Sequence, residues 1–354
     1  MVVTRSRFTA LLVALAMCLS ALALIGVGRA NAVDFKSAEV SSGWSWTNYG
    51  PELKAVSCIK PGTCVAVGQG GAVLRSPNTD EVPLAWTFID LKKDPKAPDN
   101  PVDLVGVTCS NTSCLAVSSP LTPTVAYGSW VYRSTDTGAT WVAVQQLPLV
   151  AGAKQTNVGS AIACSPDANA TADTRQCFIA GVDGGLWSSS DDGRTWAGIP
   201  LPGSSPATVS FDKIACSGPG VCVAAGGDQI PSSALIRGGA VTLLDTPPGI
   251  KKRFAALACA GPERCVGTGG VGNYSVMTMN ASPTWGTAQA FRRSPLQAGI
   301  TVKVLDCPIE NVCIGLDGDG DLLRTDALAD PSVTWAMRPV PIIIGAADCV
   351  RNAC

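Results

Sequence analysis

Residues 55–76, AVSCIKPGTCVAVGQGGAVLRS, hold the pattern that decides the fold of this 354-residue chain. A short apolar run leads into Cys58, a Pro-Gly turn separates Cys58 from Cys64, and a second apolar run ends in glycines. Apolar runs joined by a turn of this composition are typical of a β-hairpin. A third run, 72–75, follows the glycines, and a fourth run carries Trp86. The unit therefore predicts four short antiparallel strands.

The same unit recurs along the chain, and paired cysteines mark each copy. The first cysteines of successive pairs are 42 to 55 residues apart, close to the period of four-stranded propeller blades. The sequence therefore predicts an all-β, seven-bladed β-propeller of four-stranded antiparallel blades, with one disulfide per blade. The seven expected pairs are Cys58/Cys64, Cys109/Cys114, Cys164/Cys177, Cys216/Cys222, Cys259/Cys265, Cys307/Cys313 and Cys349/Cys354.

The two ends of the repeat region are expected to share the last blade. Residues 33–48 parallel the third and fourth strands of the unit, and residues 345–354 parallel its first strand and the start of its second. Joining them would cover the strand edges that an open ring exposes. The weakest point is Cys354, because the other units continue beyond their second cysteine, so this strand is short or the chain is truncated.

Residues 1–32 are expected to be a signal peptide. Arg5 and Arg7 precede an apolar run over 8–28, and residues 30–32, Ala-Asn-Ala, match an A-x-A cleavage site. Residues 33–354 would then form a single propeller domain, secreted or in the periplasm or cell envelope. The apolar run is near the length that spans a bilayer, so an uncleaved anchor is the alternative. After cleavage, no stable membrane insertion is expected.

Composition excludes several classes of function. Residues 1–32 hold three of the 26 basic residues and none of the 27 acidic ones, so the remaining chain has a net charge of −4. This charge disfavours nucleic acid as a partner. The chain has no histidine, which excludes histidine general bases, Ser-His-Asp and Cys-His systems and histidine-ligated metals. We expect no cofactor.

The cysteines admit two interpretations, structural disulfides or thiolate sites for metals or redox chemistry. Zinc sites favour the C-x₂-C spacing, which none of the seven pairs has, and an exported chain meets an oxidising compartment. The spacing therefore favours disulfides.

Two links between third and fourth strands resemble the Asp-box, S-x-D-x-G-x-T-W, of sialidase-like (BNR-repeat) propellers. The resemblance implies a structural turn, in which Asp caps backbone N–H groups, Gly takes a positive φ and Trp fills the space between blades. In families that carry it, the box lies away from the active site. The matching residues are Ser134, Asp136, Gly138, Thr140 and Trp141 in one link, and Ser189, Asp191, Gly193, Thr195 and Trp196 in the other.

The whole unit is also similar to the propellers of photosystem II assembly and stability factors and their bacterial relatives. The likeness rests on C-x-A-V-G, a glycine turn and G-x-T-W, and it covers residues 33–354 at the level of the repeat. It implies the fold rather than the role, and the sequence has no contiguous arginine patch of the kind we would require for the photosystem task.

Asp317, Asp319 and Asp321 alternate with glycines, as acids do in a calcium-binding loop. Leu322 and Leu328 stand where such a loop needs Gly and Glu. The segment also aligns with plain turns of other units. A hairpin turn is therefore preferred, and a weak calcium site is the alternative.

The sequence favours an exported, monomeric, non-enzymatic propeller that binds a protein or glycan through loops at one mouth of the central channel. Loops on rigid scaffolds are where binding usually resides. Trp44, Trp130 and Trp187 could stack on sugars, although packing between blades is the commoner role. The insertions that could bind are 91–101, 120–128, 166–175 and 226–233.

A sialidase-like glycoside hydrolase is the alternative function. It would require an arginine triad, a Tyr/Glu nucleophile pair and an acid-base Asp. The residues available as nucleophile and partner are Tyr49, Tyr127, Tyr132, Tyr274 and Glu39, Glu52, Glu81, Glu263, Glu310. The family's F/Y-R-I-P signature is absent near the start of the mature chain. The nearest text, residues 291–295, FRRSP, comes late and lacks the Ile.

Overall fold

The structure is a computed structural model in which the repeat units form short strands. Within the described residues, no helix is long and apolar enough to cross a membrane. Residues 1–32, the expected signal peptide, lie outside the described set. The structure describes residues 52–60, 63–77, 86–91, 103–111, 113–119, 128–151, 158–165, 174–203, 209–227, 232–250, 253–269, 272–280, 282–294, 297–298, 300–317, 321–326, 328 and 335–338.

Six antiparallel sheets follow one another along the described chain, each built from consecutive strands. Blades 1 to 3 comprise β1 (Leu53–Lys60), β2 (Thr63–Gly68), β3 (Ala72–Pro77) and β4 (Thr87–Asp90); β5 (Asp103–Cys109), β6 (Cys114–Ser119), β7 (Trp130–Ser134) and β8 (Val142–Gln146); and β9 (Gly159–Cys164), β10 (Cys177–Gly181), β11 (Leu186–Ser189) and β12 (Ala197–Gly198).

Blades 4 to 6 continue the same order. They comprise β13 (Lys213–Gly218), β14 (Val221–Gly226), β15 (Ser232–Arg237) and β16 (Ala240–Leu244); β17 (Phe254–Cys259), β18 (Arg264–Gly269), β19 (Asn273–Thr278) and β20 (Thr284–Trp285), with β21 (Gln289–Ala290) also on β19; and β24 (Val302–Ile309), β25 (Val312–Asp317), β26 (Leu322–Thr325) and β27 (Ala336–Arg338). A separate hairpin pairs β22 (Arg292–Ser294) with β23 (Gln297–Ala298).

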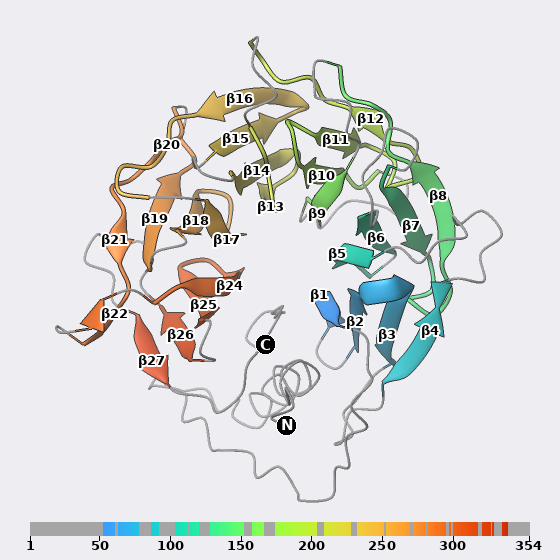
Figure 1. The fold of residues 1–354 in the computed structure, drawn as a ribbon, viewed down its shortest axis with the longest axis horizontal. Coiled ribbons are helices and arrows are strands. Elements are labelled where there is room, and N and C mark those ends of the chain that lie inside the picture. The colour runs from blue at the N-terminus through green and yellow to red at the C-terminus, as the bar shows by residue number, and fades with distance from the viewer. Residues whose placement is uncertain are drawn as a thin grey trace, which may run out of the picture.

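The blades are arranged around a central axis, with the first strand of each blade innermost (Figure 1). Successive inner strands contact each other from β1 through β5, β9, β13 and β17 to β24. The fourth strands, such as β4, β8 and β16, lie at the periphery (Figure 1). The chain is therefore a β-propeller.

The expected number of seven blades is wrong, because the structure is a six-bladed propeller. The seventh was inferred from Cys349/Cys354 together with residues 33–48, and both segments lie outside the described residues. A cysteine pair marks only one hairpin, and a blade needs two more strands.

The second strand of each blade is the most deeply buried. Strands β2 and β10 are buried at every position, and β6 at all but its last. A strand in the middle of a blade packs both faces against neighbouring blades, so it reads as a continuous apolar run rather than an alternating one. The apolar run after each second cysteine has this cause.

Five apolar clusters, each spanning two successive blades, hold the described blades together. Val67 of blade 1 packs with Leu104 of blade 2, and Val117 of blade 2 packs with Ile179 of blade 3. The interfaces between blades 3 and 4, 4 and 5, and 5 and 6 have clusters of the same kind. The position of each blade is therefore fixed by its neighbours.

Candidate functional site

Six disulfides clip the first two strands of the six blades at the face of the ring where the first strand ends. Each joins cysteines 5 to 13 residues apart in the sequence. We call this the disulfide face. Cys349 and Cys354 lie outside the described residues. The six bridges are Cys58–Cys64, Cys109–Cys114, Cys164–Cys177, Cys216–Cys222, Cys259–Cys265 and Cys307–Cys313.

The link 134–141 is a hydrogen-bonded turn on the same face. The N–H and hydroxyl groups of Thr140 donate to the two carboxylate oxygens of Asp136, at 2.8 and 2.6 Å. The Gly138 N–H donates to Ser134 Oγ, and Trp141 Nε1 donates to the Gly138 carbonyl oxygen at 3.0 Å. Partial burial raises the pKa of Asp136, but the hydrogen bonds from Thr140 and Ser134 outweigh it, so the pKa is lowered. The turn works as a structural cap.

The link 189–196 forms the same turn in blade 3. Thr195 donates its N–H and hydroxyl to Asp191 at 2.9 and 2.6 Å, and Trp196 Nε1 donates to the Gly193 carbonyl at 3.1 Å. Partial burial raises the pKa of Asp191, but hydrogen bonds from Thr195 and Ser189 outweigh this effect, so the pKa is lowered. The two links therefore form turns with the same internal hydrogen bonds.

An arginine of the preceding blade binds the turn of blade 2. Arg75, on β3, donates from Nε to the Thr137 carbonyl oxygen at 2.9 Å and from a terminal nitrogen to Thr137 Oγ1 at 2.9 Å. Thr137 has a positive φ of 56°, which turns its carbonyl toward this neighbour. The guanidinium is therefore held by neutral oxygen acceptors.

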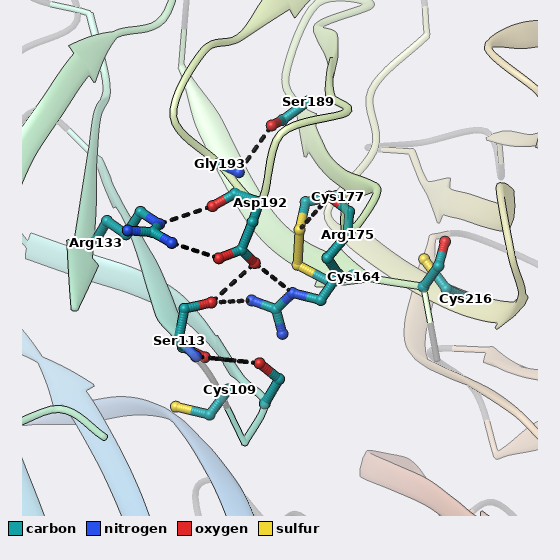
Figure 2. Close-up of a disulfide and its surroundings, with 12 residues drawn as sticks. Cys109, Ser113, Arg133, Cys164, Arg175, Cys177, Ser189, Asp192, Gly193 and Cys216 are labelled. Atoms are coloured by element: carbon teal, nitrogen blue, oxygen red, sulfur yellow. Dashed lines mark hydrogen bonds and ion pairs between the residues drawn. A yellow bond between two sulfur atoms is a disulfide. The ribbon is translucent and has the colours of Figure 1, made fainter. Parts of the chain in front are cut away.

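Arg133 binds the turn of blade 3 in the same way, and here the turn residue, Asp192, also carries a negative charge (Figure 2). Its Nε donates to the Asp192 carbonyl at 2.9 Å, and a terminal nitrogen pairs with the Asp192 carboxylate at 2.6 Å. Arg175 pairs with the other carboxylate oxygen at 2.7 Å, and Ser113 Oγ donates to it at 2.8 Å. Asp192 is fully buried, and it lies between the two arginines beside the Cys164–Cys177 bridge (Figure 2).

Arg75 and Arg133 occupy equivalent positions on the third strands of their blades, and each faces a turn residue of the next blade. We call such a pair, a third-strand residue and the turn residue that it faces, the interblade plug. The third-strand residue precedes the one that pairs with the second cysteine of its blade. By this register, the plugs are Arg75–Thr137, Arg133–Asp192, Ser188–Gly238, Leu235–Met279 and Val276–Leu328. The last two are apolar and belong to the cores between their blades.

The plug between blades 3 and 4 lacks side chains that could bridge the gap. Ser188 stands where the first two interfaces have arginine, and Gly238 and Gly239 replace the long turn. A Cβ on Gly193 would lie 2.5 Å from Leu115 of the preceding blade, whereas a Cβ on Gly239 would have nothing within 4 Å. The blade 4 turn therefore stands away from blade 3.

A pocket of about 440 Å³ lies at this interface. Its volume is within the range of ligand-binding pockets. Phe178, which pairs with Ser188 across the strands, supplies apolar surface, and the hydroxyl, amide and backbone groups around it are polar. Strands β10 to β12 line it, so it lies outside the inner strands. The lining residues are Gln176, Phe178, Ser188, Ser189, Ser190, Thr195, Trp196, Ala197, Gly238 and Gly239.

Sequence reasoning missed this pocket, although its signals are visible in the sequence. They are Ser188 in the place of Arg75 and Arg133, and a Gly-Gly hairpin in the place of an eight-residue turn. The insertions expected to bind at the channel mouth lie largely outside the described residues.

The calcium alternative gains no support from the described residues. Asp317 and Asp321 are buried, and the Asp321 N–H donates to Asp317 Oδ1 at 2.8 Å, as in a tight turn. Asp319 lies outside the described residues. Within the described part of the chain, no group of three acidic, cysteine or histidine residues could hold a metal ion.

The candidates for sugar chemistry are dispersed. Trp187 is fully buried and donates from Nε1 to the Pro148 carbonyl at 2.7 Å, so it cannot stack on a ligand. Trp130 is partly buried within the core between blades 1 and 2. Tyr274 is buried and donates to Gln289 at 2.8 Å, and burial raises the pKa of its phenol, which opposes a nucleophilic role.

Comparisons with known proteins concern the fold. No protein-family model and no curated protein matches the sequence. A structure described as YCF48 bound to D1 peptide shares 15% identity over 81% of this chain and 80% of that one, with a TM-score of 0.56. YCF48 from Cyanidioschyzon merolae shares 14% over 83% and 87%, with a TM-score of 0.55. The RRP9 WD40 repeats share 7% over 86% of both chains, with a TM-score of 0.64. At identities this low, the likenesses establish that the chain has a β-propeller fold and assign no closer family.

Proposed function

We propose that this chain is a non-enzymatic binding module that acts outside the cytoplasm and holds a peptide segment of a partner protein. The observation that carries the proposal is the pocket between blades 3 and 4. It is an opening in a series of otherwise plugged interfaces, and it combines an apolar wall with hydroxyl, amide and backbone groups. Such a mixture suits a peptide, which presents both apolar and hydrogen-bonding surface.

The frame of the pocket supports binding because it is fixed before any ligand arrives. The Cys164–Cys177 bridge and the turn at 189–196 hold blade 3, and Asp192 ties that blade to blade 2. A preorganised site avoids the entropic cost of ordering loops on binding. A structure of YCF48, whose fold is similar, is described as a complex with a D1 peptide, so a propeller of this kind can present a peptide site.

Export is part of the proposal. The pattern of residues 1–32 and the density of disulfides both fit an oxidising compartment. The expected mature chain begins at Val33, and mass spectrometry of protein recovered from the medium or envelope tests this. An intact Met1 on exported protein would contradict cleavage.

The binding test is a selection from a peptide library on purified protein with its disulfides intact. Ala197→Trp fills the pocket from its exposed rim, and Val142→Trp is the matched control, because Val142 faces Arg133 as Ala197 faces Ser188. Selected peptides should bind the wild type and the control and lose binding to Ala197→Trp. Selection of glycans instead of peptides would replace the ligand class, and equal binding to all three proteins would reject the site.

The glycosidase alternative is tested with a fluorogenic sialoside on the same preparations. We expect no turnover. Turnover that a single Glu or Tyr substitution abolishes would overturn the proposal.

A further inference from the structure

We propose that the pocket between blades 3 and 4 binds the side chain of an arginine carried by the peptide partner. This inference rests on the proposed function and names the ligand chemistry of the same site. Its basis is the way in which the chain fills the corresponding positions itself.

An arginine occupies the corresponding position at the two preceding interfaces. In both, Nε donates to the carbonyl oxygen of a turn residue in the next blade, at 2.9 Å from Arg75 to Thr137 and at 2.9 Å from Arg133 to Asp192. Thr137 and Asp192 have positive φ angles of 56° and 57°, so the same backbone conformation presents the carbonyl each time.

Blades 3 and 4 retain the receiving half of this arrangement. Gly238 has a φ of 57°, matching Thr137 and Asp192. Its N–H donates to the Gly220 carbonyl at 3.0 Å, as the Asp192 N–H donates to Arg175 at 3.0 Å. Gly238 therefore offers its carbonyl oxygen in the same setting, and the arginine is replaced by Ser188.

The walls also suit an arginine. Phe178 pairs with Ser188 as Leu115 pairs with Arg133, so it lies where the aliphatic part of an incoming arginine would pack. The Gln176 amide and the Ser188 hydroxyl line the same pocket and add oxygen acceptors. A planar guanidinium with several donors can use such spread acceptors better than a lysine ammonium can.

A carboxylate is not required for this recognition. The hydrogen bonds that Arg75 donates from Nε and from a terminal nitrogen go to neutral oxygens of Thr137. The pocket also lacks the turn residues that fill the other interfaces, so it has room for peptide backbone beside the arginine. The ligand is therefore an arginine within a peptide rather than a free guanidinium ion.

The test is an NMR titration of the disulfide-intact protein with acetyl-Gly-Arg-Gly-amide, following the amide signals of Gly238 and Gly239. The lysine and citrulline versions of the peptide are the matched probes. We expect the arginine peptide to shift both signals and to bind at least several-fold more tightly than the other two. Equal affinities for the three peptides would overturn the inference.

Ser188→Arg supplies the missing side chain from within the protein, so it should abolish binding of the arginine peptide. Thr278→Arg places an arginine on an exposed position of β19 and should leave binding unchanged. Retained binding by Ser188→Arg, with its fold verified by circular dichroism, would contradict the proposal.

Two substitutions at Gln176 test whether the ligand is positively or negatively charged. Gln176 is exposed, so these substitutions leave the packing of the core unchanged. A charge pair at an exposed position changes affinity about threefold, so Gln176→Glu should tighten binding and Gln176→Lys should weaken it by that factor. The opposite order would show that the site prefers an acidic ligand.

The two proposals fail in different ways. Library peptides without arginine that lose binding on Ala197→Trp would leave the binding function standing and reject arginine as the ligand. No library peptide binding at all, together with no shift from the arginine tripeptide, would reject both.

Discussion

Asp192 is the residue on which the interface between blades 2 and 3 depends most. Its carboxylate is fully buried and neutralises parts of two guanidinium groups that are themselves buried. Burial lowers the pKa of Arg175 and outweighs the opposing effect of the Asp192 charge and hydrogen bond, so the carboxylate offsets part of the cost of burying that cation. Removing one partner of such a pair leaves an uncompensated charge in the core.

Asp192→Ala should therefore lower the free energy of unfolding by about 3–5 kcal/mol. Asp326→Ala is the matched control, because Asp326 pairs with Arg324 at 2.8 Å but is 61% exposed. Exposed pairs contribute about 1 kcal/mol or less. Urea unfolding followed by tryptophan fluorescence measures both, and similar losses in the two variants would show that Asp192 does not hold the interface.

Asp136 and Asp191 should give the protein an acid-dependent stability. Their pKa values in the fold lie below the ordinary value of 3.8, so the stabilisation is present above that value and is lost as the pH falls through the folded pKa. Melting temperatures between pH 6 and pH 2.5 should fall more steeply in the wild type than in Asp136→Asn/Asp191→Asn. Parallel curves would exclude these carboxylates as the cause.

At the scale of the element, the two kinds of turn between third and fourth strands differ in how closely they approach the preceding blade. Gly193, with a φ of 79°, has Leu115 at 2.5 Å from where a Cβ would be, while Gly239, with a φ of 84°, has open space. Replacing glycine by alanine should therefore lower the free energy of unfolding by different amounts at the two positions.

Gly193→Ala should cost about 2–4 kcal/mol, because backbone strain and a clash with a packed side chain add. Gly239→Ala should cost about 1 kcal/mol, because only the backbone strain remains. Thermal unfolding of the two variants provides the comparison. Equal costs would mean that the blade 4 turn also packs against blade 3.

The strands themselves were largely predictable from the sequence, whereas the pocket was not. The apolar runs around Cys58 and Cys64 became β1 and β2, since local composition specifies a hairpin. Trp187, a sequence-based candidate for sugar binding, is buried, because Gly181 and Gly185 leave room for its ring. The pocket depends on register shared between blades, which becomes visible only when strand pairing is known.

At the scale of the whole molecule, each described blade has its own disulfide, and the loops that these disulfides close differ in length. The cysteines of Cys164–Cys177 are 13 residues apart and those of Cys109–Cys114 are 5 apart. Longer loops lose more entropy when closed, so a bridge that closes one restricts the unfolded chain more.

Replacing both cysteines by alanine should cost about 3 kcal/mol at Cys164–Cys177 and about 2 kcal/mol at Cys109–Cys114. Denaturant unfolding of the two double variants measures the difference. A larger loss at the shorter loop would show that native packing around the sulfurs, rather than loop closure, sets the contribution.

The number of blades shows the limit of counting motifs. Cysteine pairs predicted the hairpins of all six described blades. Counting them also predicted seven blades where the structure has six, because a hairpin signature says nothing about the third and fourth strands. The number of blades in the ring depends on how the sheets pack against one another, and the spacing of cysteine pairs alone does not determine that packing.

The nearest-neighbour pairing of the cysteines bears on how the chain acquires its oxidised form. None of the six bridges joins one blade to another, so each needs only the 5 to 13 residues between its own two sulfurs. Segments of this size close within about 100 nanoseconds, far faster than a chain is synthesised or translocated. During the proposed export, the two thiols of each pair would therefore meet before the next pair emerged, and the order of emergence would favour the correct pairings.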